Sequence, residues 1–191
     1  MTVTARPASP VAAAREVTPA TFRDALGHFC TGVTVVTAAT PDGPAGFACQ
    51  AFTAVSLEPP LVLFCPTRTS GTWPAIAAAG RFAVNVLGRD QAAVSAVFGS
   101  RGAVDRFANV RWAPAPGGAP VLLDALTWVE SVVETVHEAG DHYVVVGRVT
   151  AVGAASDDRP LLFHRGRYTS TEPDLSPPEP WLTWSHPDDW I

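Results

Sequence analysis

A short polar segment, residues 67–72, carries the clearest set of groups that could bind an anion. It reads Thr67-Arg68-Thr69-Ser70-Gly71-Thr72 and precedes an expected helix. Hydroxyl groups, backbone N–H donors, the positive end of a helix and the Arg68 guanidinium all favour a phosphate. An ordinary helix-capping loop has the same composition. Taken alone, the segment is compatible with both interpretations.

His142 is a second candidate, because it stands beside Asp141 in the turn of an expected hairpin. A histidine side chain can donate or accept hydrogen bonds near neutral pH, which suits a residue that positions a substrate. An isolated histidine in a surface turn is more often inert, so only the surrounding residues can indicate whether His142 has a functional role. Tyr168 fits equally well as one wall of a pocket and as a core residue at a strand end.

The cysteines and the other histidines show no metal-binding pattern. Cys30, Cys49 and Cys65 lack CxxC spacing and are odd in number, which disfavours a zinc site and a disulfide framework. We therefore expect no metal, and reduced thiols as in the cytoplasm. The chain also lacks a GxGxxG motif after a strand and a P-loop motif, so any nucleotide must be held in another way.

The scaffold for these groups is expected to consist mainly of strands. A helix is predicted over residues 18–29, capped by Thr18 and started by Pro19. A β-branched run over residues 33–38, a Pro-Asp-Gly turn and an extended segment over residues 45–56 predict a hairpin. The continuous apolar run over residues 61–65 is typical of a strand that is buried on both faces.

Further elements follow at short spacing. A helix is expected over residues 73–79, with Ser70 or Thr72 as its cap and Gly80 as its stop, and then a strand over residues 81–87. A third helix is expected over residues 90–98, an irregular region over 99–118, and a hairpin of strands over 125–137 and 143–152. Short segments at 161–163 and around 168 complete the core. Six or seven strands without long helical crossovers predict an antiparallel barrel.

The composition limits the possible domain organisation and disfavours several classes of protein. A chain of 191 residues with 47% hydrophobic residues is long enough for one sizeable core. We expect a disordered lead over residues 1–17, one domain over 18–170, and a tail over 171–191 rich in proline and tryptophan. The apolar runs are too short to span a membrane and the lead lacks a secretory pattern, which favours the cytoplasm. A net charge of −5 argues against binding to nucleic acid.

Five motifs occur in the order found in a known family. They are Thr31–Thr37 (TGVTVVT), Gly46–Phe52 (GFACQAF), Val55–Leu61 (VSLEPPL), Phe82–Leu87 (FAVNVL) and Gly140-Asp141-His142. Together they resemble the flavin reductase domain family, which has the FMN-binding split-barrel fold. Residues 46–50 and 57–66 are most similar to reductase components that serve hydroxylases of phenolic substrates. Gln50 departs from the pattern, since many relatives have asparagine there.

The resemblance implies a fold and a site. We expect a mostly β fold, an antiparallel split β-barrel with a few short peripheral helices. The residues that it places around FAD or FMN and NADH are Thr31, Gly32, Val33, Thr34, Ala48, Cys49, Gln50, Ala51, Val55, Ser56, Cys65, Pro66, Arg68, Ser70, Thr72, Asn85, His142 and Tyr168. Hydride transfer does not require a general acid, so His142 is expected to position the nicotinamide.

The function that the resemblance implies is NADH-dependent reduction of FAD or FMN. The reduced flavin would pass to a partner flavin-dependent monooxygenase that hydroxylates an aromatic, phenolic substrate in catabolism or natural-product biosynthesis. A homodimer is implied as well, with the tail available to cover a neighbouring subunit. Two alternatives stay open: a split-barrel flavoprotein oxidase that retains its flavin, and a non-catalytic flavin-binding module.

Overall fold

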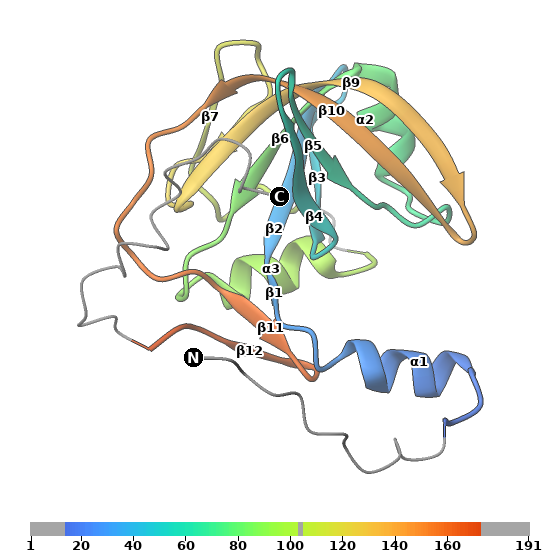
Figure 1. The fold of residues 1–191 in the computed structure, drawn as a ribbon. Helices are drawn as coiled ribbons and strands as arrows, with labels where there is room; N and C mark the ends of the chain where they lie inside the picture. The colour runs from blue at the N-terminus through green and yellow to red at the C-terminus, as the bar shows by residue number, and fades with distance from the viewer. Residues whose placement is uncertain (1–13, 103–104, 173–191) are drawn as a thin grey trace, which may run out of the picture.

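The structure is a computed structural model that describes residues 14–102 and 105–172 (Figure 1). The expected disordered lead lies outside the described residues except for 14–17, and the expected tail does so except for 171–172. The three tryptophans of that tail at positions 181, 184 and 190 are therefore outside as well.

A seven-stranded antiparallel sheet forms the body of the molecule, with the order β3-β2-β6-β9-β10-β5-β4. Its strands are β2 (Thr34–Thr40), β3 (Gly43–Cys49), β4 (Phe52–Leu57), β5 (Pro60–Phe64), β6 (Arg81–Val86), β9 (Thr127–Ala139) and β10 (His142–Val152). Every pairing within it is antiparallel, and short turns join the neighbouring pairs β2–β3, β4–β5 and β9–β10. The predicted mostly β, antiparallel fold is thus confirmed.

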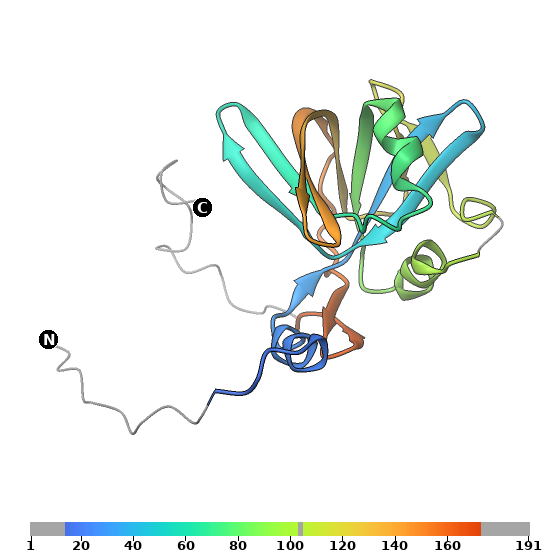
Figure 2. The same cartoon turned by 90° about the vertical axis from the view of Figure 1, so that its right-hand side faces the viewer.

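Two smaller sheets and three helices complete the described fold. One sheet contains β1 (Thr31–Gly32), β11 (Leu162–His164) and β12 (Arg167–Thr169), and the other contains β7 (Trp112–Pro114) and β8 (Pro120–Leu122). The helices are α1 (Pro19–Leu26), α2 (Trp73–Ala79) and α3 (Ala92–Gly99). Figures 1 and 2 show α2 against the curved main sheet and α3 near the lower end of that sheet, while α1 stands apart beside β11 and β12.

Successive residues at the start of the second strand divide between two cores, because side chains alternate between the faces of a strand. Val36 belongs to a cluster with Phe64, Phe82 and the helix α2 residue Ile76. Val35, one residue earlier, belongs to a cluster that contains Phe98 of α3. The sheet is therefore covered on both faces at β2, by a different helix in each case.

The first helix begins as predicted. The Thr18 hydroxyl accepts a hydrogen bond from the Thr21 backbone N–H at 3.2 Å, and Pro19 occupies the first helical position. The second helix ends at Gly80, whose φ of 65° lies in the left-handed region that glycine tolerates best. Both helix boundaries follow from local chemistry, and the sequence was sufficient to predict them.

The expectation of one extended segment over residues 45–56 was wrong. The chain breaks at Gln50 and Ala51 into β3 and β4, because the two halves have different partners: Cys49 pairs with Thr34 of β2, whereas Phe52 pairs with Phe64 of β5. This change of partner leaves a short non-strand connection at residues 50–51. Both residues of that connection line the cavity of the candidate site.

Two further expectations need correction. The run over residues 61–65 is not buried on both faces, since Val62 and Phe64 are buried while the alternating Leu61 and Leu63 are partly exposed. The region 99–118 is not irregular throughout, because β7 lies within it and pairs with β8. Their connection is held by the buried Glu130 carboxylate, which accepts hydrogen bonds from the backbone N–H groups of Gly117 and Ala119 at 2.8 and 3.0 Å.

Candidate functional site

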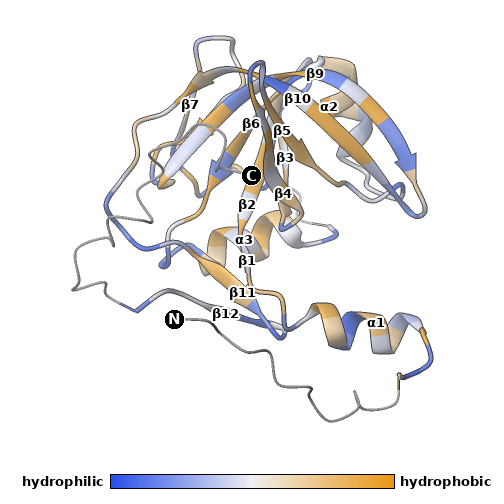
Figure 3. Ribbon diagram, viewed as in Figure 1, coloured by the Kyte–Doolittle hydropathy of each residue, from blue (hydrophilic) through white to orange (hydrophobic). Residues whose placement is uncertain are grey.

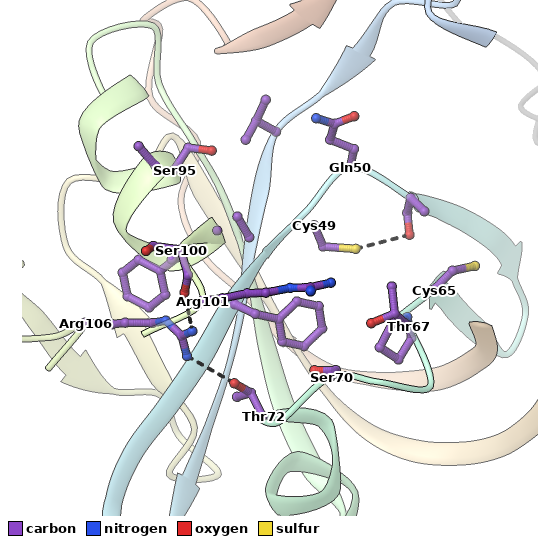
Figure 4. Close-up of a pocket in the computed structure, with 18 of the residues that line it drawn as sticks. Cys49, Gln50, Cys65, Thr67, Ser70, Thr72, Ser95, Ser100, Arg101 and Arg106 are labelled. Carbon is purple, nitrogen blue, oxygen red and sulfur yellow. Dashed lines mark hydrogen bonds between the residues drawn. The ribbon is translucent and has the colours of Figure 1, made fainter. Parts of the chain in front are cut away.

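A cavity of about 790 Å³ opens where several chain segments converge at one end of the sheet (Figure 4). Its walls come from the end of β3, the connection at residues 50–51, the loop before α2, the second half of α3, and the β11–β12 hairpin. A cavity of this size falls in the range that accommodates cofactors and drug-sized ligands.

Most of the residues predicted from the sequence are brought together on its walls. They are Val33, Ala48, Cys49, Gln50, Ala51, Cys65, Pro66, Ser70, Thr72, His142 and Tyr168. These residues are up to 135 positions apart in the chain, from 33 to 168, and come from six segments. Their convergence is a property of the sheet topology, which places the ends of β3, β5 and β10 around one opening.

The other predicted site residues do not line the cavity, namely Thr31, Gly32, Thr34, Val55, Ser56, Arg68 and Asn85. Asn85 is fully buried, where its amide nitrogen donates to the Val35 carbonyl oxygen at 3.0 Å and its amide oxygen accepts from the Leu122 N–H at 2.7 Å. The Thr34 hydroxyl donates to the Cys49 carbonyl oxygen at 2.7 Å, so it holds the adjacent cavity wall in place.

The Arg68 side chain points to the β9–β10 ribbon rather than to the cavity. Its Nη1 atom lies 3.2 Å from the Glu138 carboxylate, and its guanidinium carbon lies 5.6 Å from the centre of the Tyr143 ring. The Arg68 backbone N–H also donates to the Asp141 carbonyl oxygen at 2.9 Å. These contacts attach the loop before α2 to the ribbon that carries His142.

Four hydroxyl residues of the loop before α2 line the cavity, and Ser70 and Thr72 are the two that were predicted as site residues. The Ser70 Oγ accepts a hydrogen bond from the Trp73 backbone N–H at 3.1 Å, so Ser70 provides the side-chain cap of α2. Thr72 occupies the N-cap position without such a bond, and its Oγ1 instead lies 3.1 Å from Nη1 of Arg106. Of the two caps predicted, only Ser70 has that contact.

Arg101 and Arg106 were not among the predicted site residues. Figure 4 shows the Arg101 side chain extended across the cavity and Arg106 beside Thr72. Both belong to the segment after α3, where the sequence contains no recognisable anion-binding pattern. Ser95 and Phe98 of α3 and Phe163 of β11 also line the cavity and were missed, since apolar periodicity alone does not distinguish a pocket wall from the core.

The charge of the cavity opposes the charge of the chain. The net charge is −5, yet Arg101 and Arg106 line the cavity, and no aspartate or glutamate among the described residues does so. Two guanidinium groups without a facing carboxylate, together with hydroxyl donors, favour an anionic ligand. The rest of the wall is largely apolar, which suits a ligand with a flat unsaturated part and an anionic part.

His142 lies at the rim of the cavity, where Tyr143 and Thr67 hold its strand against the loop before α2. The Tyr143 N–H donates to the Pro66 carbonyl oxygen at 2.9 Å, and Thr67 and His142 form an isolated antiparallel bridge. The Nδ1 atom of His142 lies 2.7 Å from the Asp141 carboxylate. This hydrogen bond, and then the charge of His142, hold the pKa of Asp141 below its ordinary value.

The two cysteines of the cavity are apolar in character. Burial raises the pKa of the Cys49 thiol to about 11, and burial also raises the pKa of Cys65. Both thiols are free and neutral at physiological pH, so they serve as small wall residues and not as nucleophiles. Residues 14–102 and 105–172 contain no cluster of ligands suited to a metal ion, and none of their helices is long and apolar enough to cross a membrane.

This arrangement agrees with the comparison to known families. Residues 26–172 match the flavin reductase like domain family, which is most of the chain. The chain belongs to this family. It is 48% identical over 186 residues to the reductase subunit HsaB of a flavin-dependent monooxygenase from Rhodococcus jostii, covering 94% of this chain and 95% of that protein. The HsaB protein of Mycobacterium tuberculosis is 51% identical over 168 residues, 87% of this chain and 89% of that protein.

Solved structures of family members have the same fold. Nitrilotriacetate monooxygenase component B from Mycobacterium thermoresistibile superposes with a TM-score of 0.80 at 49% identity, over 86% of this chain and 92% of that one. The NADH:FAD oxidoreductase SgcE6 of Streptomyces globisporus, solved with NAD and FAD fragments, has a TM-score of 0.79 at 34% identity, over 85% and 100%. The chain therefore shares both the family and the fold of these proteins.

Proposed function

We propose that this chain is an NADH-dependent flavin reductase that supplies reduced FAD or FMN to a partner flavin-dependent monooxygenase. The observation that carries the proposal is the composition of the cavity. Cations and hydroxyl donors gather in the part lined by Arg106, Ser70 and Thr72, small apolar side chains form another part, and His142 stands at the rim. A flavin has a matching division between its phosphate and its flat ring system.

The flavin phosphate would be held by the hydroxyl groups of Ser70 and Thr72, with positive charge from Arg106. The guanidinium has only donors and each hydroxyl can donate its proton, and phosphate oxygens are acceptors. The seven predicted residues that lie off the cavity would act on the site only through their neighbours. Thr34 and Asn85, for example, would stabilise the strands that form its wall.

The ring system would lie along the wall formed by Ala48, Cys49 and Ala51. Their small side chains allow a flat ring to approach the backbone closely, and the neutral thiol of Cys49 adds no charge there. When bound, the flavin supplies a ring that accepts a hydride from the nicotinamide. The protein contributes position and the exclusion of water, as is usual for cofactor enzymes.

His142 would position the nicotinamide at the open side of the ring. Asp141 bonds to Nδ1 of this histidine, so the opposite ring nitrogen, Nε2, is the one available to a substrate. Because the pKa of Asp141 is lowered, its carboxylate keeps this hold throughout the neutral range. The histidine thus has a defined orientation before NADH binds.

The proposed partner is a monooxygenase that takes up diffusible reduced flavin. The relatives from Rhodococcus and Mycobacterium are named reductase subunits of flavin-dependent monooxygenases, which supports this role. The motifs at residues 46–50 and 57–66 favour an aromatic, phenolic substrate for that partner. A reducing, cytoplasmic location belongs to the proposal too, since the three cysteines are free thiols.

A homodimer is also part of the proposal, and α1 supports it. Phe22, Leu26 and Phe29 in and after this helix are 57%, 51% and 71% exposed, and none of the residues of α1 is buried. Figure 3 shows hydrophobic residues on this helix, which stands apart from the main sheet. Clustered exposed apolar residues of this kind favour burial against another protein surface, here a second copy.

The test is steady-state oxidation of NADH, and separately of NADPH, by flavin-free protein with FAD, FMN or no flavin added. We expect turnover only with added flavin and faster turnover with NADH. Turnover by tightly retained flavin with slow exchange would favour the oxidase alternative, and flavin binding without NADH consumption would favour the binding module.

Sedimentation at several protein concentrations tests the dimer. A Phe22→Ser, Leu26→Ser variant should shift the monomer–dimer equilibrium towards the monomer.

A further inference from the structure

We propose that Arg106 is a positioning residue that turns the Thr72 hydroxyl into a fixed hydrogen-bond donor for the flavin phosphate. The inference rests on the proposed function, because it concerns the ligand of the same cavity. It assigns a role to a residue that no sequence motif indicated. Three observations support it: the contacts of Arg106, the hydrogen-bond inventory of Thr72, and the uncompensated charge of Arg106.

Arg106 joins three separate segments around the part of the cavity that would hold the phosphate. Its Nη1 atom donates to the Gly46 carbonyl oxygen at 3.2 Å and to the Thr72 hydroxyl at 3.1 Å, and its Nη2 atom donates to the Ser100 carbonyl oxygen at 2.7 Å. These acceptors belong to β3, the loop before α2 and the C-terminal end of α3. A guanidinium is suited to this task, because its planar group carries donors in fixed directions.

The contact with Arg106 sets the direction of the Thr72 hydroxyl. A threonine hydroxyl has one proton and two lone pairs, whereas a guanidinium can only donate. The Thr72 oxygen therefore accepts from Arg106, and its own proton remains available to an acceptor in the cavity. Ser70 is arranged in the same way, since its oxygen already accepts from the Trp73 N–H. The hydroxyls of Ser70 and Thr72 are thus both held as donors.

The charge of Arg106 is not neutralised within the described part of the chain. No carboxylate of residues 14–102 and 105–172 forms an ion pair with it, and its buried Nε atom has no hydrogen-bond partner there. Arg106 is partly buried, a charge that is partly removed from water without a counterion carries a desolvation cost, and a bound anion would reduce that cost. Arg68 differs, because its guanidinium is paired with Glu138.

The experiment compares FMN with riboflavin, which has the same ring system and no phosphate. Dissociation constants would be measured by fluorescence for the wild type and for Arg106→Met, Arg106→Lys and Arg111→Met. Arg111 is an arginine of the same segment that pairs with Asp124 and does not line the cavity, so its variant is the matched control.

We expect Arg106→Met to weaken FMN binding by roughly 10- to 100-fold, as for a lost charge-assisted hydrogen bond, and to leave riboflavin binding within about 2-fold. Arg106→Lys should recover part of the FMN affinity, and Arg111→Met should change neither constant. An equal loss for FMN and riboflavin would overturn the inference, since it would show a general structural role. Should Arg106→Met not fold, the Arg106→Lys variant still gives the FMN-to-riboflavin comparison.

A double-mutant cycle with Thr72→Val tests whether Arg106 acts through Thr72. In the Thr72→Val background, Arg106→Met should weaken FMN binding by a smaller factor than in the wild-type background. The same factor in both backgrounds would contradict the positioning role and indicate that Arg106 acts independently. A wild-type protein that binds FMN but does not oxidise NADH would refute the proposed function and still allow this inference to be judged on the binding constants.

Discussion

The phenolic oxygen of Tyr168 lies 2.9 Å from the hydroxyl oxygen of Ser95, and this hydrogen bond connects the last described strand with helix α3. The two residues are 73 positions apart and both line the cavity. Tyr168 also packs edge-on against Phe163, with ring centroids 5.4 Å apart. Its side chain is therefore part of the cavity wall, although 41% of it remains exposed.

Replacing Tyr168 with phenylalanine should remove the hydrogen bond and keep the ring contact. We expect a decrease in the free energy of unfolding of about 1 kcal/mol, which is typical of one such bond, and a change in flavin affinity below roughly 5-fold. Tyr168→Ala should have a larger effect on flavin affinity because it removes the wall. Denaturant unfolding and flavin titration measure the two quantities, and equal affinities for all three proteins would show that Tyr168 takes no part in binding.

Replacing His142 with alanine should mainly raise the KM for NADH. The side chain is held at the cavity rim by Asp141, but hydride transfer does not require it as an acid. We expect a KM increase of roughly 10-fold with a much smaller change in kcat, as for a lost positioning contact. Asp141→Asn should give a weaker effect of the same kind. Steady-state kinetics with varied NADH measures both constants, and unchanged KM and kcat would refute the positioning role of His142.

Stability should fall in alkaline solution because of Cys49. Its pKa in the folded chain is about 11, against an ordinary value of 9.0, since burial disfavours the thiolate. Below pH 9 the thiol is neutral in both the folded and the unfolded chain. Between about pH 9 and 11 only the unfolded chain ionises, so the free energy of unfolding decreases by about 2 to 3 kcal/mol across that window.

The Cys49→Ala variant provides the comparison for this pH effect. Its free energy of unfolding should decline less between pH 9 and 11 than that of the wild type, whereas Cys30→Ala, which alters an exposed thiol, should follow the wild type. Denaturant unfolding at several pH values gives both curves. Parallel curves for the wild type and Cys49→Ala would contradict the assignment to Cys49.

Gly147 permits close packing in the middle of β10, so Gly147→Ala should destabilise the fold. An added methyl group would overlap the ring of Phe82, whose Cε1 atom would be only 2.8 Å away, and it would lie 3.1 Å from the Ser131 Cβ. Phe82 is fully buried and cannot move freely, so a loss of roughly 1 to 3 kcal/mol is expected, as for an overpacked core. Gly32→Ala is the control, because nothing lies within 4 Å of its added methyl. Similar melting temperatures for both variants would show that the core adapts.

Much of the fold could be predicted because the relevant signals are local. Helix α1 follows from the Thr18 cap and the proline after it, α2 from its cap at Ser70 and its stop at Gly80, and the strands from runs of β-branched residues. The predictions failed where contacts with residues far away in the chain determine the local structure. The break at residues 50–51 depends on two different neighbouring strands, and the β7–β8 connection depends on the Glu130 carboxylate.

The sequence by itself determined the family, the mostly β architecture and about half of the residues on the cavity wall, because ordered motifs and residue periodicity are properties of the chain. Only the tertiary structure decided which cations serve the cavity. Arg68, within the predicted loop, turns to Glu138, while Arg106, which is 34 positions after Thr72, bonds to that threonine. The physical reason is that a long arginine side chain takes its partners from whatever the folded chain brings near it, and that proximity is not encoded in local spacing.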